Sequence, residues 1–531
     1  MKKFTGFIVL ILGTIGGYYL YQKQVKKKIS PYILYAQEIP GTYRIGFTNL
    51  DKEVRIDQLP VIGTIPAWIS GKLFRNGPAR FSCGDSWVDW FDGLAMVHAF
   101  TIDNGRVSYA NKFLRTSNYQ EVQKTGKMSY GGFAQDPCRT IFQRIAGYFQ
   151  PIKSKFPEIP NANVNIAHYG DNFVALTEIP LPVEFDPETL ETLGVLNYQD
   201  ALPKSAIHDT PHPHYDPVHK EHLIYFTKFG RVSSHNICRI KDGSVKREII
   251  ATIDIEQPSY MHSFAITEKY AILAALPLVV NPLDLILKQQ AFIKNFVWKP
   301  ELGTKFMVVD RLKNKLVGIY RAEPFFAFHN VNAFEEFGQI VLDIVTYPNA
   351  AGIGKAKISE LLAPFTAYAQ LDSTQMGREL DADILEAGTL KRFTIDINSG
   401  AVHSRKLAAE RIELPRINYE NYNGKNYTYV YAYSKSHREP YYVADKLVKL
   451  NIKNSTQLEW KQEKCYPGEP VFLGRPGAKQ EDDGVVLSVV LDAKRATSFL
   501  LILDGKSFTE IARAEVPHHI PFGIHGQFFK R

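Results

Sequence analysis

The sequence predicts an all-β fold assembled from many short strands, of the sandwich, barrel or propeller type. Short apolar or alternating runs recur along the chain and are separated by Gly, Pro, Asn and Asp, the pattern of strands joined by turns. Aromatic residues make up 12% of the 531 residues, with 33 Phe and 28 Tyr. Aromatic side chains fit the pleated surface of a sheet, although the same content also suits an apolar ligand tunnel. No internal repeat of about 20–50 residues is visible, so the residues alone leave the three architectures open.

The expected strands continue from the first third of the sequence almost to its end. No Pro-rich or Ser-rich linker interrupts residues 41–531, and we predict that they form one large domain. The runs that carry the strand pattern are 72–78, 172–180, 222–230, 269–277, 338–348, 427–434, 484–492 and 498–506.

Two apolar stretches, at 136–151 and 276–298, break this pattern. The first places apolar side chains near one side of a possible helix, and the second is too interrupted to span a bilayer. Both are consistent with helices that pack in the core, because a helix with one apolar face usually buries that face there. Both are equally consistent with segments that lie in a membrane interface.

The N-terminal segment has the features of a membrane anchor. Residues 4–21 carry no charge, lysines flank them on both sides, and the run ends in Tyr18, Tyr19, Leu20 and Tyr21. A spanning helix needs about 20 mostly apolar residues, and tyrosines are common at the membrane boundary. No small-residue cleavage site follows the run, as it would in a signal peptide. We therefore predict an uncleaved transmembrane anchor at 1–28 and a linker at 29–40. The protein would then be membrane-associated, on a side that the balanced lysines leave open.

Charge and cysteine content exclude other classes of protein. The formal net charge of +8 is too dilute over 531 residues to predict nucleic-acid binding, which needs a basic face or stripe. The cysteines form no Cys-x-x-Cys pair, which argues against a zinc ribbon or a disulfide framework. We expect isolated buried thiols at Cys83, Cys138, Cys238 and Cys465.

Four of the 15 histidines lie in aromatic or apolar surroundings rather than in charged loops. A buried neutral imidazole needs a partner, and a metal is one such partner. The four are far apart in the sequence, so only the fold can bring them together. From the residues alone, ordinary buried histidines remain the more common outcome. The absence of H-E-x-x-H removes the commonest zinc-protease pattern. The four are His212, His262, His329 and His525.

A series of motifs in a fixed order identifies the chain as a relative of a known family. They include FRNGPARF, WFDGLAMVHAF, PSYMHSF, FHNVNAFEE and EDDGVVLSVV, and they extend from about residue 40 to the C-terminal residues. This sequence resembles the carotenoid cleavage oxygenases, most of all the branch of the animal β-carotene oxygenases and the retinal pigment epithelium isomerohydrolase. The resemblance implies a seven-bladed β-propeller with iron on its axis and a helical and loop cap over one face.

The resemblance also implies a set of site residues. His212, His262, His329 and His525 would be the catalytic ligands of one Fe(II) per chain, and His214 would be a neighbour of the site. Carboxylates would accept the other ring N–H of three of these histidines, which fixes the orientation of each ring and raises its basicity. The matching positions are Glu178, Glu413 and Glu469, with Thr177 lining the site and Asp92, Gly93 and His98 in structural roles.

The expected activity is cleavage of a conjugated carbon–carbon double bond of a carotenoid or apocarotenoid by O₂, giving two carbonyl products. A lipophilic polyene needs a long apolar tunnel, and membrane lipid is its natural reservoir. No nucleic acid and no obligate protein partner are expected. Within the family, a retinyl ester isomerohydrolase and a stilbene-cleaving dioxygenase remain open. A carotenoid-binding propeller without catalysis is the alternative from another class, although all four histidines are present.

Overall fold

The computed structural model describes residues 41–83, 86–126, 132–134, 158–202, 207–288, 290–353, 388–436 and 443–531. The predicted anchor at 1–28, the linker at 29–40 and the apolar stretch at 136–151 lie outside the described residues. Within the described ranges, no helix is long and apolar enough to cross a membrane.

The described chain is mostly β, which confirms the predicted class. Every run that carried the strand pattern contains a strand, and GVVLSVVLD is strand β32, Gly484–Asp492, without any shift of its ends. The described helices are short: α2, Ser117–Thr125; α4, Pro282–Leu287; and α7, Tyr419–Tyr422. Four 3₁₀ turns complete the helical part: η1, Tyr43–Phe47; η2, Trp90–Asp92; η3, Phe292–Asn295; and η4, Pro300–Leu302.

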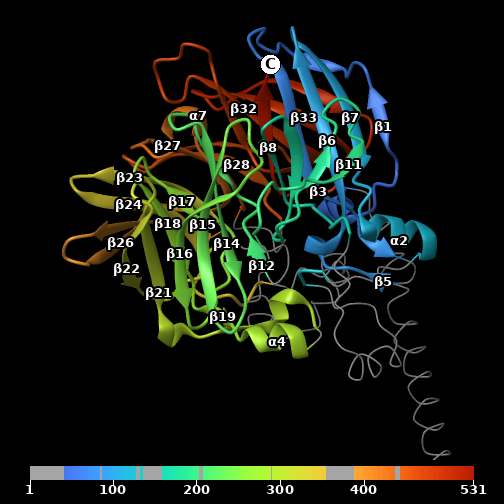
Figure 1. Ribbon diagram of the computed structural model, residues 1–531. Coiled ribbons are helices and arrows are strands. Elements are labelled where there is room, and N and C mark those ends of the chain that lie inside the picture. The colour runs from blue at the N-terminus through green and yellow to red at the C-terminus, as the bar shows by residue number, and fades with distance from the viewer. Residues whose placement is uncertain are drawn as a thin grey trace, which may run out of the picture.

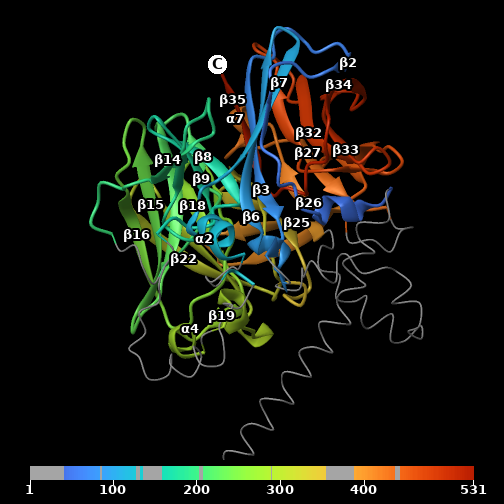
Figure 2. The same ribbon diagram turned by 90° about the vertical axis from the view of Figure 1, so that its right-hand side faces the viewer.

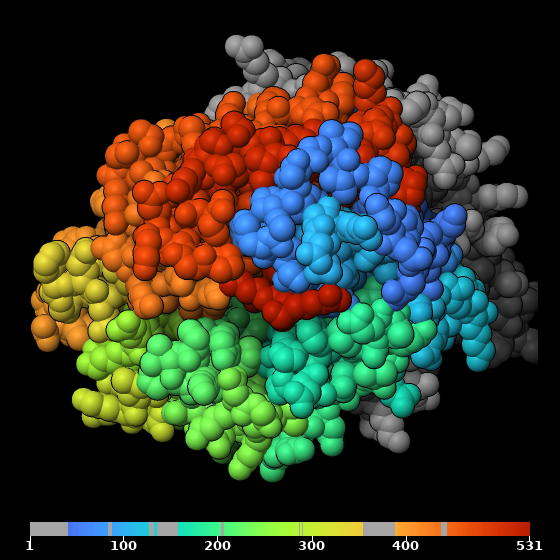
Figure 3. Space-filling model, turned by 90° about the horizontal axis from the view of Figure 1, so that it is seen from above, coloured from blue at the N-terminus to red at the C-terminus, as the bar shows by residue number. Residues whose placement is uncertain are grey.

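Antiparallel sheets follow one another around the molecule in chain order. Seen from above, the colours pass from blue through green and yellow to red around a centre (Figure 3). One sheet contains the first and the last strand of the described chain. Its order is β1 (Val54–Ile56), β7 (Arg106–Phe113), β6 (Leu94–Asp103), β3 (Gly71–Arg80) and β35 (Gly526–Lys530). The next is β11 (Thr192–Val195), β10 (Val183–Phe185), β9 (Asn172–Leu176) and β8 (Asn165–Tyr169).

Two further sheets continue the series. One is β12 (Ile207–Asp209), β14 (Glu221–Lys228), β15 (Ser233–Lys241) and β16 (Glu248–Ile255), with β13 (His214–Asp216) also paired to β14. The other is β17 (Ala265–Ile266), β18 (Tyr270–Ala275), β21 (Thr304–Asp310) and β22 (Lys315–Ala322).

The last third of the chain forms the two largest sheets. The seven-stranded sheet is β23 (Asn330–Glu336), β24 (Gln339–Thr346), β25 (Gly388–Asp396), β26 (Val402–Arg416), β27 (Tyr429–Ser434), β28 (Lys446–Asn451) and β29 (Thr456–Trp460). The other is β2 (Val61–Gly63), β34 (Glu510–Val516), β33 (Thr497–Asp504), β32 and β30 (Cys465–Pro467), with β31 (Val471–Gly474) also paired to β32. A two-stranded ribbon, β4 (Ser82–Cys83) and β5 (Ser86–Trp87), stands apart.

Strands from the beginning of the described chain close the ring against strands from its end. β3 pairs with β35, with Leu73 opposite Phe528, and β2 pairs with β34, with Ile62 opposite Arg513 (Figures 1 and 2). Side chains of these two sheets pack together, including the fully buried Phe100 and Ile502. Burial of each such side chain contributes roughly 1.5–3 kcal/mol, so closure is stabilised by packing as well as by strand pairing.

The apolar stretch at 276–298 is neither one helix nor a continuous strand. It contains β19 (Leu278–Val280), then α4 and η3, and then β20 (Phe296–Trp298), which pairs with β19. Asn281 caps the helix by accepting a hydrogen bond from the Leu283 N–H, and Pro282 occupies the first turn, where proline is tolerated. The segment lies at the end of the molecule opposite the C-terminus (Figures 1 and 2).

Candidate metal centre

Four histidines from four different sheets meet inside the ring. His212 lies between β12 and β13, and His262 lies shortly before β17. His329 directly precedes β23, and His525 directly precedes β35. Each histidine therefore lies at or just before the first residue of a strand. The beginnings of these four strands meet at the centre of the ring.

The ring nitrogens of the four histidines face one another. Nε2 of His212 lies 3.0 Å from Nε2 of His262, and Nε2 of His329 lies 3.2 Å from Nε2 of His525. One ligand atom from each ring can be chosen so that all four lie within 4.8 Å of one another. His212 and His525 are 313 positions apart in the sequence, and all four residues still form one compact nitrogen cluster.

Carboxylates fix the outward-facing nitrogens of two of these rings. His262 Nδ1 donates to Glu178 Oε1 at 2.6 Å, and His329 Nδ1 donates to Glu413 Oε2 at 2.5 Å. An ionised carboxylate only accepts, so Nδ1 carries the proton and Nε2 presents its lone pair to the centre.

Each of these two carboxylates also accepts a hydrogen bond from a tyrosine. The Tyr260 hydroxyl donates to Glu178 Oε1 at 2.6 Å, and the Tyr347 hydroxyl donates to Glu413 Oε1 at 2.7 Å. The sequence analysis did not name either tyrosine. Tyr260 lies two residues before His262 in PSYMHSF, whereas nothing near Tyr347 in the sequence points to the site.

The third carboxylate has charged partners instead of a tyrosine. Glu469 Oε1 accepts from His525 Nδ1 at 2.8 Å, and Glu469 Oε2 accepts from the buried Arg75 guanidinium. Arg416 Nε lies 3.2 Å from Oε1, and the Gly526 N–H donates to Oε2 at 3.1 Å. This carboxylate thereby joins the metal centre to the β3–β35 pairing that closes the ring.

His212 is fixed through its backbone rather than by a described carboxylate. Its N–H donates to Thr210 Oγ1 at 3.1 Å, and the Thr210 hydroxyl donates to the His262 carbonyl at 3.0 Å. One threonine thus connects the two loops whose histidines make the closest nitrogen pair.

Strand β26 is distorted where it brings Glu413 to the centre. The pairing of β26 with β27 is irregular between Glu413 and Arg416. Leu414 adopts a φ of +47°, a region rarely used by a branched residue, and its N–H donates to Glu413 Oε2 at 2.5 Å. Such local strain is common where a strand turns a functional side chain inward.

Burial keeps three of the clustered imidazoles neutral. It is the largest cause that lowers the pKa of His212, His262 and His525, and repulsion between neighbouring rings adds to it. The pKa of His525 falls to about 3 despite attraction to Glu469. Neutral imidazole is the form that binds metals, so these three rings are in the ligating state at neutral pH.

The three carboxylates are held in the ionised form. Burial alone would raise the pKa of Glu178, but its electrostatic interactions with His208 and His262 and the hydrogen bond from His262 lower it to about 2. Burial likewise opposes ionisation of Glu413 and Glu469, and in both cases nearby imidazole or guanidinium groups still lower the pKa.

This donor set fits a metal ion. The Nε2 lone pair of His262 faces His212 Nε2 at 3.0 Å, and a second lone pair at that distance would be repelled unless a cation lay between them. Ligand nitrogens at about 2.1 Å from a metal and at right angles to each other are about 3.0 Å apart. Imidazole suits zinc, copper, iron and nickel. The residues therefore match a transition-metal site with four nitrogen ligands.

The other residues named from the sequence lie near this cluster but outside it. Both ring nitrogens of His214 are in use, one with the Tyr419 hydroxyl at 2.8 Å and one with the Phe264 carbonyl at 2.9 Å. Thr177 directly precedes Glu178 and is partly buried. In the WFDGLAMVHAF motif, Asp92 accepts the Phe133 and Ala134 N–H groups, Asn161 and Asn163 donate to the Gly93 carbonyl, and His98 Nδ1 lies 2.8 Å from the Tyr109 hydroxyl.

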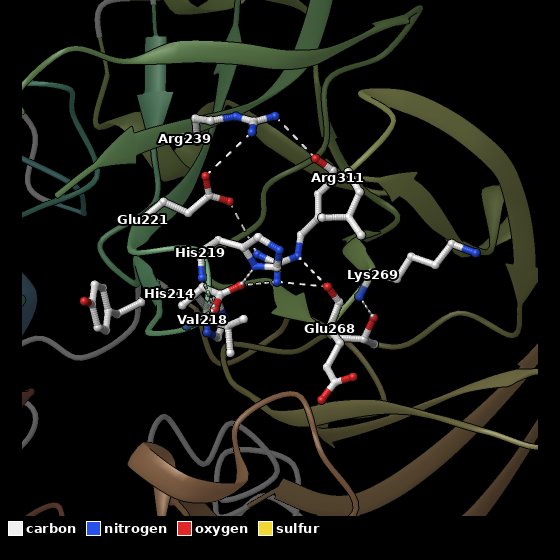
Figure 4. Close-up of polar contacts among 12 residues, drawn as sticks. His214, Val218, His219, Glu221, Arg239, Glu268, Lys269 and Arg311 are labelled. Carbon is white, nitrogen blue, oxygen red and sulfur yellow. Dashed lines mark hydrogen bonds and ion pairs between the residues drawn. The ribbon is translucent and has the colours of Figure 1, made fainter.

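A buried ion network holds the strand that follows His212. Arg311 forms ion pairs with Asp216, at the end of β13, and with Glu221. Figure 4 shows Arg311 and Glu221 with the polar contacts around them. His219 Nδ1 also lies 2.8 Å from Asp216 Oδ2. Breaking a buried pair by removing one partner typically costs about 3–5 kcal/mol, so this network holds the end of β13 firmly in place.

Aromatic rings surround one side of the cluster. Phe328 lies edge-on to His262, with ring centroids 5.7 Å apart, and Tyr260 stacks on Phe326 at 6.3 Å. Such a wall excludes water and favours an apolar ligand. The rings that extend it are Phe91, Phe133, Phe229, Phe292 and Phe296.

Comparison with known sequences places the chain among carotenoid oxygenases. The family model described as retinal pigment epithelial membrane protein matches residues 47–530. A mitochondrial carotenoid-cleaving dioxygenase from Mustela putorius furo is 31% identical over 526 residues, which cover 91% of this chain and 95% of that protein. A β,β-carotene 15,15'-dioxygenase from Gallus gallus is 33% identical over 508 residues, covering 88% and 94%.

Solved structures show the same relationship. The crystal structure of cobalt-substituted Synechocystis apocarotenoid oxygenase has a TM-score of 0.78 and 28% identity, over 92% of this chain and 98% of that one. A chimera of that oxygenase with the retinal pigment epithelial protein has a TM-score of 0.79 and 27% identity, over the same shares. The protein described here is therefore a member of the carotenoid oxygenase family that includes the retinal pigment epithelial membrane protein.

Proposed function

We propose that this protein is a non-haem Fe(II) dioxygenase that cleaves a conjugated carbon–carbon double bond of a carotenoid or apocarotenoid with O₂. The observation that carries the proposal is the cluster of His212, His262, His329 and His525, whose ligand atoms lie within 4.8 Å. Relatives that match about nine-tenths of the chain are named carotenoid-cleaving and β-carotene dioxygenases. Both atoms of O₂ enter the products, one on each carbon of the broken double bond, so two carbonyl compounds form and no other reductant is needed.

One iron per chain is the cofactor that these residues would hold. Bound iron would supply the open coordination positions and redox chemistry that reaction with O₂ requires. Glu178, Glu413 and Glu469 would keep the Nδ1 protons of three ligands in place, and every Nε2 would remain free to bind.

The rest of the site would orient the polyene. The aromatic wall around Phe328 presents an apolar, water-excluding surface beside His262. A long conjugated chain held against such a surface can bring only one of its double bonds to the metal, and this position decides which products form. Thr177, next to Glu178, would line the same space.

A seven-bladed propeller is the architecture that we propose for the ring. In the seven-stranded sheet, the first part of β26 pairs with β25, whereas Glu413 and Arg416 near its end pair with β27. Division at this point gives two four-stranded units, β23–β26 and β26–β29. Together with the other five large sheets, this division supports seven blades around the metal centre.

Residues 41–531 would form this domain, and residues 1–28 would anchor it to a membrane through the linker at 29–40. Leu283 and Leu287 on α4 are 60% and 61% exposed, so this end of the domain also offers apolar side chains to lipid. A protein without residues 1–28 that still floats with liposomes would support a role for the domain surface. Complete loss of flotation would assign membrane binding to the anchor alone.

Iron content and β-carotene turnover in air test the proposal. We expect about one iron per chain and aldehyde products from the wild-type protein. His262→Ala should lose both, since it removes a ligand from the cluster. The matched control is His403→Ala, because His403 is an exposed histidine of β26 and should not affect either quantity. A wild-type protein without bound iron would contradict the proposed centre.

The same turnover under strict anaerobiosis separates this function from that of a retinyl ester isomerohydrolase, which uses the metal without consuming O₂. Cleavage that stops without oxygen supports the dioxygenase. Continued conversion of a retinyl ester without oxygen would replace the proposed reaction with isomerohydrolysis.

A further inference from the structure

A fifth buried histidine, His208, approaches the metal centre from behind one of its carboxylates. Its Nε2 lies 3.2 Å from Glu178 Oε2, on the side opposite the contact between Glu178 Oε1 and His262. The His208 side chain is 2% exposed. Neither of its nitrogens makes an aligned hydrogen bond in the described part of the chain, and neither does Glu178 Oε2. Three polar atoms of the site are thus buried without an aligned partner, and two of them face each other.

Packing holds the His208 ring beside Glu178. His208 is the central residue of β12 and lies opposite Thr227 of β14. Its ring stacks on Phe292, with centroids 5.4 Å apart and an interplanar angle of 8°, and it also contacts Tyr260 at 5.4 Å. Both neighbours belong to the aromatic wall. They confine the ring to the position from which Nε2 faces the carboxylate.

Comparison of the three carboxylates shows why this contact matters. Glu413 and Glu469 each accept aligned hydrogen bonds on both oxygens. Glu178 accepts two on Oε1, from Tyr260 and His262, and has only His208 beside Oε2. A buried carboxylate oxygen without a donor destabilises the folded protein, because it loses its hydrogen bonds to water and gains none in return. A donor is therefore expected at the one position that His208 fills.

We propose that His208 Nε2–H donates to Glu178 Oε2 and that His208 is thereby a positioning residue of the metal centre, acting through Glu178 on His262. A separation of 3.2 Å is within hydrogen-bond range. The inference rests on the proposed metal centre and extends it by one residue.

Three substitutions of His208 separate its hydrogen bond from its packing. His208→Phe keeps an aromatic ring stacked on Phe292 but has no donor. His208→Asn has a donor too short to reach Glu178, and His208→Gln places an amide N–H near the original Nε2. The control is His235→Phe, because His235 of β15 is equally buried, and its described partner is Thr227 at 2.8 Å rather than Glu178.

The measurements are the dissociation constant for Co(II), by competition with a chelator, and the visible absorption of the cobalt protein, which reports ligand geometry. Loss of an outer hydrogen bond to a metal-ligand assembly typically weakens metal binding by about 10–100-fold. We expect that loss and a changed cobalt spectrum in His208→Phe and His208→Asn. We expect near wild-type values in His208→Gln and His235→Phe.

The outcomes distinguish failure of this inference from failure of the proposed function. A wild-type protein that does not bind Co(II) would contradict the metal centre itself. Wild-type binding with unchanged affinity in His208→Phe and His208→Asn would overturn the role of His208 alone. An equal loss in His235→Phe would attribute the effect to general packing and would also overturn it. If His208→Phe does not fold, the Asn and Gln variants decide the question, with thermal unfolding as the check on folding.

Discussion

The three carboxylates of the metal centre are oriented by different partners, although each accepts an Nδ1–H from one histidine. Tyrosine hydroxyls hold Glu178 and Glu413, whereas the guanidinium of Arg75 holds Glu469. A neutral donor leaves the negative charge of the carboxylate uncompensated, but a guanidinium neutralises it. His262 and His329 therefore lie next to more negative partners than His525 does.

Glu413→Gln tests how much one such carboxylate contributes. Glutamine can accept the His329 Nδ1–H but carries no charge, so the imidazole becomes a weaker ligand. We expect the metal dissociation constant to rise by about 10-fold or more. Metal competition titrations at neutral pH measure this change.

Glu410→Gln is the matched control for that experiment. Glu410 lies on the same strand and pairs with Lys446 at 3.0 Å, away from the histidines. Its substitution should leave metal binding unchanged. Equal effects in the two variants would argue against a specific role for Glu413.

At this scale, the sequence identified residues through motifs and missed those whose position depends on tertiary packing. The four histidines and three glutamates lie in motifs that match a family, and the structure brings all seven together. Tyr347 and His208 belong to no such motif. His208 lies beside Glu178 because the N–H of the next residue, Asp209, donates to the Glu178 carbonyl at 3.0 Å, and no local pattern encodes that contact.

At the scale of elements, the approach of β35 to β3 determines where His525 lies. A Cβ on Gly526 would be 2.1 Å from the Phe74 carbonyl oxygen and 2.9 Å from the Arg75 Cα. Because both contacts are with backbone atoms, neither strand can accommodate the extra carbon without moving. Only glycine allows the two strands to pair at the residue that follows the ligand.

Gly526→Ala should therefore loosen the end of the ring and displace His525. Overpacking of this kind costs about 1–3 kcal/mol, so we expect a lower melting temperature together with weaker metal binding. Thermal unfolding and metal titration of the same preparation measure both effects.

Gly230→Ala provides a comparison at a loop position, where the nearest atom to an added Cβ is 3.5 Å away. That variant should behave like the wild type. A Gly526→Ala protein with unaltered metal affinity would show that β35 can shift without moving its histidine.

Strands were predictable from sequence because turn residues and apolar runs encode them locally. The stretch at 276–298 was not, because its strands β19 and β20 pair with each other across a helix. The apolar residues of this stretch therefore belong partly to strands and partly to helical turns. The spacing of apolar residues alone does not distinguish the two.

At the scale of the whole molecule, buried neutral histidines make stability depend on pH. Burial lowers the pKa of both His98 and His235 from 6.5 to about 3. Below pH 6.5 these two histidines become protonated in the unfolded chain but stay neutral in the folded protein. Their contribution to the free energy of unfolding is fully present above pH 6.5. It is lost as the pH falls towards 3, at about 1.4 kcal/mol per pH unit for each histidine.

His98→Gln should flatten this dependence. Between pH 6.5 and pH 4.5 the metal-free variant should lose stability less steeply than the wild type, by about 1.4 kcal/mol per pH unit. Denaturant unfolding at several pH values measures the slope. His403→Gln alters an exposed histidine and should keep the wild-type slope. A His98→Gln slope equal to that of the wild type would mean that His98 is already protonated in the folded protein.

The fold class was predictable at this scale, but the closure of the ring was not. Composition and turn spacing are properties of short segments, whereas closure depends on the pairing of β2 with β34 and of β3 with β35. Only the resemblance to a family indicated that such distant strands meet.

That closure also sets an order for folding. Arg75 bonds to the Ile524 carbonyl, 449 positions away in the sequence, and contacts so distant in sequence form slowly because loop-closure entropy must first be overcome. His212, His262 and His329 come from consecutive sheets and can gather early, whereas His525 arrives only when the ring closes. A chain whose ring has not yet closed would therefore offer three nitrogen ligands and one open side. A metal captured in that state would be exposed to solvent and exchangeable until the last strand covers it.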